Sequence, residues 1–385
     1  MRQQYEVKQC SGHNFSATED KPKKTVEYFI SAEEMVWNYS PKRQWELEKH
    51  GTGKNSPSNI FVEQGKNMIG SRYKKVVYRE YTDETFHFKK SRSPSQKHLE
   101  ILGPIIKAEV GEQIIVTFKN KATRPYSLTA QGIRSTTATP SCCVSLTGYV
   151  LQLTWDIPPS AGPGDSDPDC ITYAYYSTVD FIKDMYSGLL GPLVVCRPGT
   201  LTSDRKIVNV DKEFALLFMV YDENQSWYLD ENIRTYLGVD PDNVTDDADF
   251  MESNMMHGIN GKVYGNLQGL VMTEGQRVNW YLLGMGNEVD MHTVHFHTDR
   301  VHRADVFDLF PGTFQTIEMV AQSPGTWLLH CHVSDHIHAG METVYTIQGI
   351  FHLTQCMYYL VVHIIISSVS LFLTELSSQG KITKY

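Results

Sequence analysis

The sequence predicts an all-β protein with two tandem Greek-key β-sandwich domains and an apolar C-terminal tail. Segments such as 105–118 and 271–283 are rich in β-branched and aromatic residues, and turn residues separate their short apolar stretches. This pattern is typical of antiparallel strands at the spacing found in a β-sandwich. The length of 385 residues suits two or three domains, each large enough to bury a core.

An internal repeat supports two copies of one domain. The residues at 102–113 parallel those at 267–276, and Tyr-Ala-Tyr-Tyr-Ser-Thr-Val-Asp at 173–180 parallels Trp-Leu-Leu-His-Cys-His-Val-Ser at 327–334. Because self-similarity of this kind marks a repeated structural unit, we expect the same sandwich twice along the chain.

The domain boundaries follow from the repeat and from a change of composition. We expect the first domain in residues 1–200, the second in 201–348 and the tail in 349–385. Within the tail, 357–373 is mostly apolar, whereas a membrane-spanning helix needs about 20 apolar residues. We therefore keep two interpretations open, a marginal membrane span at 357–373 and a non-native extension.

The charge balance limits the classes of partner. The chain has 44 acidic and 35 basic residues, a formal net charge of −9, and no long basic run. Proteins that bind nucleic acid carry clustered positive charge, so we expect no nucleic-acid partner.

Two runs near the C-terminus hold eight candidate metal ligands within fifty residues. Side chains alternate between the two faces of an extended strand. The strand through His330, Cys331 and His332 therefore turns its thiol to one face and its two imidazoles to the other. The same alternation places His295 and His297 on one face and His292 on the opposite face. One strand is therefore able to serve two metal sites. The eight ligands are His292, His295, His297, His330, Cys331, His332, His336 and Met341.

The ligand types favour copper. Cys331, His292, His336 and Met341 form a His2Cys set with a thioether, which is the ligand set of a blue-copper electron-transfer centre. The other four histidines form an imidazole-only group. A zinc site closes with four compactly spaced ligands, which fits this pattern less well, and ordinary half-buried histidines are the remaining alternative.

The first domain lacks equivalent ligands. None of the aligned side chains replaces an imidazole or a thiolate as a copper ligand, so we expect a structural or docking domain. Thr129 and Gln131 stand opposite His295 and His297, and Tyr176, Ser177 and Thr178 stand opposite His330, Cys331 and His332.

Cysteines and glycosylation sequons suggest an oxidising compartment. Cys170 and Cys196 flank one strand-rich segment and are candidates for a disulfide. Met1 is not followed by an apolar signal region. Either the start of a longer secreted or membrane-anchored protein is absent, or the chain stays in the cytosol. The sequons are at Asn14, Asn38, Asn224 and Asn243.

These motifs resemble the vertebrate multicopper ferroxidases, the family of ceruloplasmin and hephaestin, over roughly residues 1–348. The most specific stretches include Tyr175-Tyr-Ser-Thr-Val-Asp, Trp227-Tyr-Leu-Asp and Gly325-Thr-Trp-Leu-Leu-His-Cys-His. The resemblance implies two cupredoxin-like domains, of which only the second carries copper ligands. It also implies an oxidase that takes electrons from Fe(II) and reduces O2 to water.

The resemblance assigns a role to each ligand. The thiolate set would hold type 1 copper, which accepts one electron at a time, and the imidazole group would hold half of a trinuclear cluster. Cys331 links the two because it lies between two cluster histidines. His295 would be a type 2 ligand, and His297, His330 and His332 type 3 ligands.

Iron ligands are also implied by the resemblance. Glu252, His257 and Asp335 match the substrate-iron ligands of the family, and Glu288 matches a carboxylate that serves an iron site in a neighbouring domain. Carboxylate oxygens are hard ligands that suit iron and stabilise the ferric product.

The chain departs from the family in one essential respect. In the family, the first and last domains each give four histidines to the cluster, but residues 1–198 contain no His-x-His pair. We therefore expect a fragment that needs N-terminal cupredoxin domains, or a partner chain, to complete the cluster. The alternative is a catalytically silent copper-binding or interaction module that resembles the A domains of coagulation factors.

Overall fold

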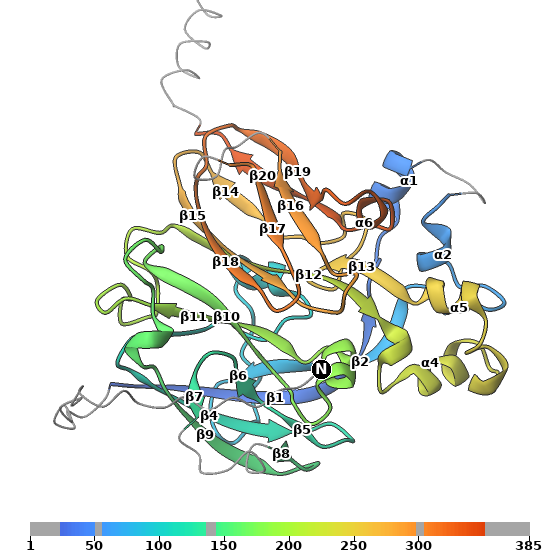
Figure 1. Cartoon of the computed structure of the whole chain (residues 1–385), viewed down its shortest axis with the longest axis horizontal. Coiled ribbons are helices and arrows are strands. Elements are labelled where there is room, and N and C mark those ends of the chain that lie inside the picture. Colours follow the sequence, from blue (N-terminus) through green and yellow to red (C-terminus); the bar gives the residue numbers. More distant parts are fainter. Residues whose placement is uncertain (1–23, 51–55, 136–143, 298–303, 351–385) are drawn as a thin grey trace, which may run out of the picture.

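The computed structural model describes residues 24–50, 56–135, 144–297 and 304–350 (Figure 1). Among these residues, no helix has the length and apolar character that a membrane span requires. The segment 357–373, for which we considered a membrane span, lies outside the described residues.

Two sheets form the first half of the described chain, and each buries one face against the other. The five-stranded sheet has the order β2-β1-β4-β9-β7, and the four-stranded sheet has the order β3-β11-β10-β6. The first sheet contains β2 (Arg72–Tyr81), β1 (Thr25–Asn38), β4 (Gln113–Asn120), β9 (Val150–Asp156) and β7 (Arg134–Ser135). The second contains β3 (Ile106–Glu109), β11 (Leu190–Cys196), β10 (Cys170–Tyr176) and β6 (Thr129–Ala130). A separate pair joins β5 (Tyr126–Ser127) and β8 (Val144–Ser145).

Two further sheets form the second half. Their orders are β13-β12-β15-β18 and β14-β20-β19-β16-β17. The first contains β13 (Met255–Ile259), β12 (Lys212–Asp222), β15 (Arg277–Gly284) and β18 (Phe314–Val320). The second contains β14 (Val271–Thr273), β20 (Glu342–Gln348), β19 (Gly325–Cys331), β16 (His292–Phe296) and β17 (Val306–Leu309).

The two halves repeat one topology. In each, a long first strand pairs antiparallel with one neighbour and parallel with another, as β1 does with β2 and β4, and β12 with β13 and β15. The register repeats as well, because Tyr176 pairs with Thr129 as His330 pairs with His295. The predicted all-β class with two sandwiches is thereby confirmed, while the boundary at residue 200 stays a prediction.

Short helices connect the strands and lie at the ends of the sandwiches (Figure 1). The last of the α-helices follows β19 directly, which brings it next to the metal-ligand motif. The α-helices are α1 (Gln44–His50), α2 (Asn59–Val62), α3 (Phe181–Ser187), α4 (Leu229–Tyr236), α5 (Ala248–Ser253) and α6 (Ser334–His338). The 3-10 helices are η1 (Pro94–Leu99), η3 (Pro159–Ala161), η4 (Glu223–Gln225) and η5 (Pro241–Asn243).

The disulfide expected between Cys170 and Cys196 is present. These residues stand directly opposite each other on the antiparallel strands β10 and β11. Among the described residues, Cys331 is the free cysteine, and it is buried.

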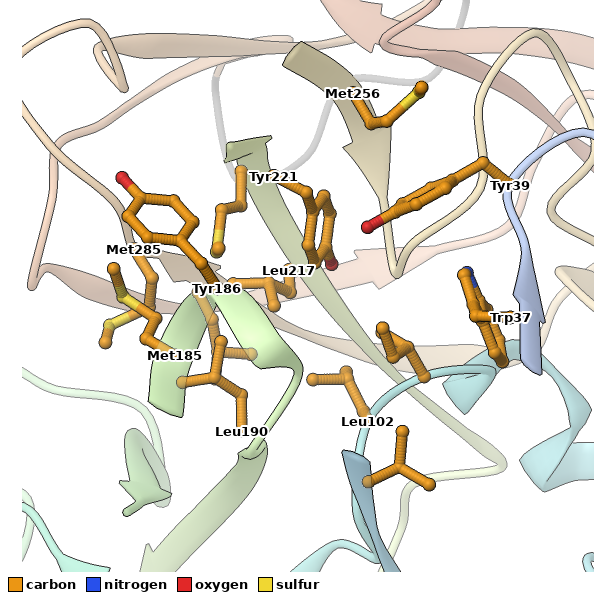
Figure 2. Close-up of a cluster of buried hydrophobic side chains, with 14 of the residues drawn as sticks. Trp37, Tyr39, Leu102, Met185, Tyr186, Leu190, Leu217, Tyr221, Met256 and Met285 are labelled. Atoms are coloured by element: carbon orange, nitrogen blue, oxygen red, sulfur yellow. The ribbon is translucent and has the colours of Figure 1, made fainter. Parts of the chain in front are cut away.

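A third hydrophobic core lies between the two sandwiches, in addition to one core inside each. Met185, Tyr186 and Leu190 of the first sandwich face Leu217 and Tyr221 of the second in Figure 2. Burying an aliphatic or aromatic side chain of this size contributes about 1.5–3 kcal/mol. The shared core therefore holds the two sandwiches together as one packed unit.

A buried ion pair crosses this shared core. The Lys75 ammonium on β2 donates to the Glu223 carboxylate of η4 and, at 2.6 Å, to the Tyr186 carbonyl. The Tyr39 hydroxyl donates to the same carboxylate. Both charged side chains are fully buried, and this burial lowers the pKa of Lys75 and raises that of Glu223.

Removing one partner of this pair leaves a buried charge without compensation. We expect Glu223→Gln to lower the free energy of unfolding by roughly 3–5 kcal/mol in urea denaturation. The matched control is Glu231→Gln, because Glu231 pairs with the neighbouring Lys74 at 2.9 Å but is 54% exposed. Glu231→Gln should lower the free energy of unfolding by no more than about 1 kcal/mol. An equal decrease of the free energy of unfolding in Glu223→Gln and Glu231→Gln would contradict a special contribution of the buried pair.

Candidate metal centre

The pairing of β16 with β19 positions both ligand groups. Val294 stands opposite Cys331, and His295 stands opposite His330. Along β16, His292, Val294 and Phe296 are buried while the alternate positions are more exposed. The alternation predicted from the sequence is present in this strand pair, so His292 and Cys331 occupy one face, and His295 and His330 occupy the other.

One group, the thiolate group, consists of the imidazoles of His292 and His336 and the thiol of Cys331, which binds a metal as a thiolate. The Nδ1 atoms of His292 and His336 lie 3.2 Å apart, and Cys331 Sγ lies 3.8 Å from the first and 3.5 Å from the second. Metal–nitrogen bonds of about 2.0 Å and metal–sulfur bonds of about 2.3 Å place the donors of one ion about 3.3–3.8 Å apart. The three atoms therefore fit a single metal ion, and all three residues are buried.

Backbone hydrogen bonds place Met341 beside this group. The chain leaves β19 at Cys331, forms α6 and returns so that Met341 N–H donates to the His336 carbonyl at 2.9 Å. The Met341 carbonyl accepts from Cys331 N–H at 3.0 Å. Met341 is fully buried in the same apolar core as Cys331. Its position is consistent with the predicted thioether ligand.

Asp290 is a functional residue that the sequence reasoning missed. Its buried carboxylate lies 3.3 Å from His292 Nε2 and accepts from the Val220 and Asn287 N–H groups at 2.6 and 2.8 Å. An Nε2–H donated to Asp290 leaves Nδ1 of His292 as the free donor atom toward the metal position. The available signal was closeness along the chain, since Asp290 precedes His292 by two residues.

Burial shifts the titration of these ligands in opposite directions. It raises the pKa of the Cys331 thiol and lowers the pKa of His336 to about 4. The nearby His292 ring lowers the His336 pKa further. At neutral pH the imidazole of His336 is therefore ready to bind a metal, whereas the thiol still carries its proton.

The second group contains imidazoles alone. Nε2 of His297 lies 3.0 Å from Nε2 of His330, and His295 completes a set of three possible ligands. His332 is more exposed, with its ring centre 5.3 Å from that of His295 and 5.6 Å from that of His330. All four predicted histidines are thus gathered on one face.

Hydrogen bonding suits this group to metal binding. His330 Nδ1 lies 2.8 Å from the Cys331 carbonyl, an acceptor, so Nδ1 carries the proton and Nε2 is free to coordinate. Nδ1 of His295 is buried and has no hydrogen-bond partner among the described residues. Burial also lowers the pKa of His330 to about 4. Neutral imidazoles with free nitrogens are the form that copper requires.

The first sandwich has a hydrogen-bonded polar cluster at the equivalent position. Ser177, which aligns with Cys331, donates to Asp184 at 2.6 Å and accepts from Ser127 N–H at 3.0 Å. These groups satisfy one another, and no comparable ligand group occurs among the described residues of this half.

Of the predicted iron ligands, His257 lies next to His336, and the predicted set does not form a third ligand group among the described residues. The ring of His257 on β13 is centred 5.3 Å from that of His336, and its Nδ1 lies 2.9 Å from the Met255 carbonyl. Burial lowers the pKa of His257 to about 4. Glu252, Asp335 and Glu288 are all exposed.

Comparison with known proteins decides the family. A multicopper oxidase model matches residues 237–349, and a second model of the same description matches residues 98–199. The chain belongs to the multicopper oxidase family. This confirms the resemblance inferred from the sequence motifs, and it makes copper the metal for which the two ligand groups are suited.

Several members of the multicopper oxidase family are close relatives. The chain is 53% identical to a protein named ferroxidase HEPHL1 from Homo sapiens. The aligned 358 residues cover 90% of this chain and 31% of the relative. It is also 52% identical to hephaestin from Mus musculus, over 89% of this chain and 30% of that protein. The identity to ceruloplasmin from Homo sapiens is 52%, over 90% of this chain and 33% of that protein. The chain therefore spans about a third of the length of these proteins.

Solved structures share the fold. A multicopper oxidase, mgLAC, superimposes with a TM-score of 0.52 at 16% identity, over 84% of this chain and 86% of that one. A copper nitrite reductase from Nitrosomonas europaea gives a TM-score of 0.52 at 15% identity, over 84% and 94%. These likenesses support the cupredoxin-like architecture.

The pKa directions predict proton release on metal binding. Because the Cys331 thiol binds as a thiolate while His336 is already neutral, we expect Co(II) binding at pH 7 to release about one proton per ion. The apparent affinity should rise about tenfold per pH unit between pH 7 and 8.5. Titration calorimetry in buffers of different protonation enthalpy measures the release. Persistence of the same release in Cys331→Ser would assign it to another group.

Proposed function

We propose that this chain contributes the electron-accepting part of a ferroxidase, a multicopper oxidase that converts Fe(II) to Fe(III) and reduces O2 to water. One observation carries the proposal, namely the convergence of His292 Nδ1, His336 Nδ1 and Cys331 Sγ within 3.2–3.8 Å, with all three residues buried. The relative named ferroxidase HEPHL1, together with the resemblance of the sequence motifs to the ferroxidase family, supports this choice of substrate.

Each protein group has a separate task in this proposal. Bound copper would supply one-electron transfer at the thiolate group and a part of the oxygen-reducing centre at the imidazole group. Asp290 orients His292, and the apolar core around Cys331 and Met341 excludes water. Cys331 is bonded through the chain to His330 and His332, so the two groups are connected by the shortest covalent route that a strand offers.

The surface next to His336 suits a ferrous ion. Asp335 precedes His336 in α6 and is exposed, and His257 has a free Nε2 because its Nδ1 faces the Met255 carbonyl. Glu252 lies on α5, one of the elements adjacent to β13. Carboxylate oxygens favour Fe(III) over Fe(II), which promotes the loss of an electron from the bound substrate. Movement of the exposed side chains of Glu252 and Asp335 toward His257 would complete this iron site. Glu288 would instead contribute a carboxylate to an iron site in a neighbouring domain.

The imidazole group needs further ligands to complete a trinuclear centre. Four histidines gather here, and the first sandwich offers a serine-rich polar cluster in place of a second set. We propose that cupredoxin domains outside this chain, or a partner chain, supply the complementary histidines. The disulfide and the sequons are consistent with an extracellular or membrane-anchored location, in an oxidising compartment.

The incomplete imidazole group also favours a second candidate function. In that case the chain binds copper through the thiolate group but performs no turnover, and serves as a binding or interaction module. An experiment that reports electron acceptance without requiring O2 separates the two candidates.

Loading the thiolate group with Cu(II) should give strong visible absorption from thiolate-to-copper charge transfer. We expect Cys331→Ser to abolish this band and His336→Gln to shift it or reduce it severalfold. His338→Gln is the matched control, since His338 is exposed and outside both ligand groups, and should keep the spectrum of the unaltered chain. A band that survives in Cys331→Ser would exclude the proposed ligand set.

Anaerobic addition of Fe(II) should then bleach the band by one electron per thiolate group. We expect Asp335→Asn and Glu252→Gln to slow the bleaching by about tenfold each, because each loses a carboxylate worth about 1.4 kcal/mol toward the ferric product. Asp246→Asn, at an acidic residue between η5 and α5, is the control. Stopped-flow absorption measures the rate. Failure of Fe(II) to bleach a fully formed band would favour the silent module.

A further inference from the structure

A cavity of about 520 Å³ lies against β2 and η1, and its wall contains none of the predicted copper ligands. Residues of the first sandwich form most of its wall, and Gln268 of the second sandwich completes it. Met35 and Trp37 supply an apolar portion. A volume of this size lies within the range of pockets for small organic ligands, about 300–1,000 Å³.

Two arginines in this cavity converge on the same pair of carbonyl oxygens. Arg92 donates to the Glu100 carbonyl at 2.6 Å and also to the Leu102 carbonyl. Arg79 approaches the same two carbonyls at 3.4 Å each, and its remaining partners are the Tyr78 carbonyl at 2.9 Å and the Met35 sulfur at 3.6 Å. The two guanidinium groups are therefore held next to each other by neutral acceptors.

The backbone at Glu100 is shaped for this arrangement. Its φ of 43° lies in the left-handed region, which residues other than glycine seldom adopt. This conformation ends η1 and turns the Glu100 carbonyl toward the guanidinium groups. Such strain persists only where the surroundings hold it, so the arginine pair is a fixed feature of the fold.

The arginine charges lack carboxylate partners. Neither Arg79 nor Arg92 forms an ion pair with a carboxylate in the described part of the chain. The two carboxylates in the cavity wall are engaged elsewhere, because Glu80 pairs with Lys90 at 2.8 Å and Glu100 faces Lys262 at 3.6 Å.

Two further lysines line the cavity, and they differ in whether a carboxylate among the described residues pairs with them. Lys97 is exposed at the edge of the cavity, and Lys89, which also lines it, pairs with Glu33 outside the wall at 2.5 Å. Burial and the charge of Arg92 lower the pKa of Arg79 to about 10. Glu33, Glu80 and Glu100 offset these charges only from a distance, without a direct ion pair. Two adjacent guanidinium groups that are partly removed from water therefore favour an anion between them.

We propose that this cavity binds a small multivalent oxyanion, either a phosphate group or a polycarboxylate, through Arg79 and Arg92. The planar guanidinium presents N–H donors in a fork that matches the paired oxygens of both classes. Lys97 adds charge at the entrance, and Trp37 and Met35 contact the carbon skeleton of an organic ligand. Because both sandwiches contribute to the wall, the bound anion stabilises their contact.

Titration calorimetry on the full chain at low ionic strength tests the site, with inorganic phosphate and citrate as separate probes. We expect at least one probe to bind with millimolar affinity or better, and a tighter citrate constant assigns the polycarboxylate class. Arg92→Gln should weaken binding by about tenfold or more, and Arg92→Lys by less, since lysine keeps the charge but lacks the fork. Bound anion should also raise the melting temperature of the unaltered chain.

The controls separate a specific site from general charge. Arg72→Gln removes one positive charge from an exposed position on the same strand and should leave binding within about twofold. Lys97→Gln does not disturb buried structure and should weaken binding by about two- to fivefold, which keeps the test informative if Arg92→Gln fails to fold. Absence of binding for both probes, or equal losses in Arg72→Gln and Lys97→Gln, would overturn the proposal. Neither result depends on copper or on ferroxidase activity.

Discussion

The alternation of side chains across the β16–β19 strand pair is the constraint on which the site depends. Since Cys331 stands opposite Val294, it points into the apolar core, while His330 and His295 point to the other face as a pair. A shift of this register by one residue would exchange the two faces and place the thiol among the imidazoles. The apolar face of β16 makes such a shift costly, because Val294 and Phe296 would lose their burial. The hydrophobic core therefore holds the ligand geometry in place before any metal binds.

The ligand-free first sandwich has a structural role that the shared core explains. Its strand β2 presents Lys75 to Glu223 of the second sandwich, and its helix α3 presents Tyr186 to the same core. Glu223 follows β12 directly, and Asp290 accepts from Val220 on that strand. The support for His292 is thus continuous with the contact between the sandwiches. Removal of the first sandwich would expose the face of β12 that carries Leu217 and Tyr221, next to the Val220 N–H group that binds Asp290.

The arginine cavity lies against the shared core, whereas Cys331 and Met341 lie in the core of the second sandwich. Trp37, whose Nε1 donates to the Gly261 carbonyl at 2.6 Å, lies in the cavity wall and in the shared core together with Leu99. A ligand in the cavity would therefore stabilise the contact between the sandwiches, whereas a metal bound by His292, Cys331 and His336 would stabilise the second sandwich itself. Independent ligands that stabilise one folded unit raise its stability additively when neither alters the other site.

The sequence by itself determined the fold class, the repeat, the disulfide candidates and the two ligand groups, because strand alternation and repeat spacing are local properties that each segment carries. It also determined the family, through runs around Cys331 that are specific in order and spacing. The tertiary structure decided what depends on contacts between distant segments. These are the orientation of His292 by Asp290, the approach of His257 to His336, the pairing of Lys75 with Glu223 and the meeting of Arg79 with Arg92. Most of these pairs are separated by many residues, and burial shifts the pKa values of Lys75, Glu223 and His257, so neither the proximity nor these pKa values could be read along the chain.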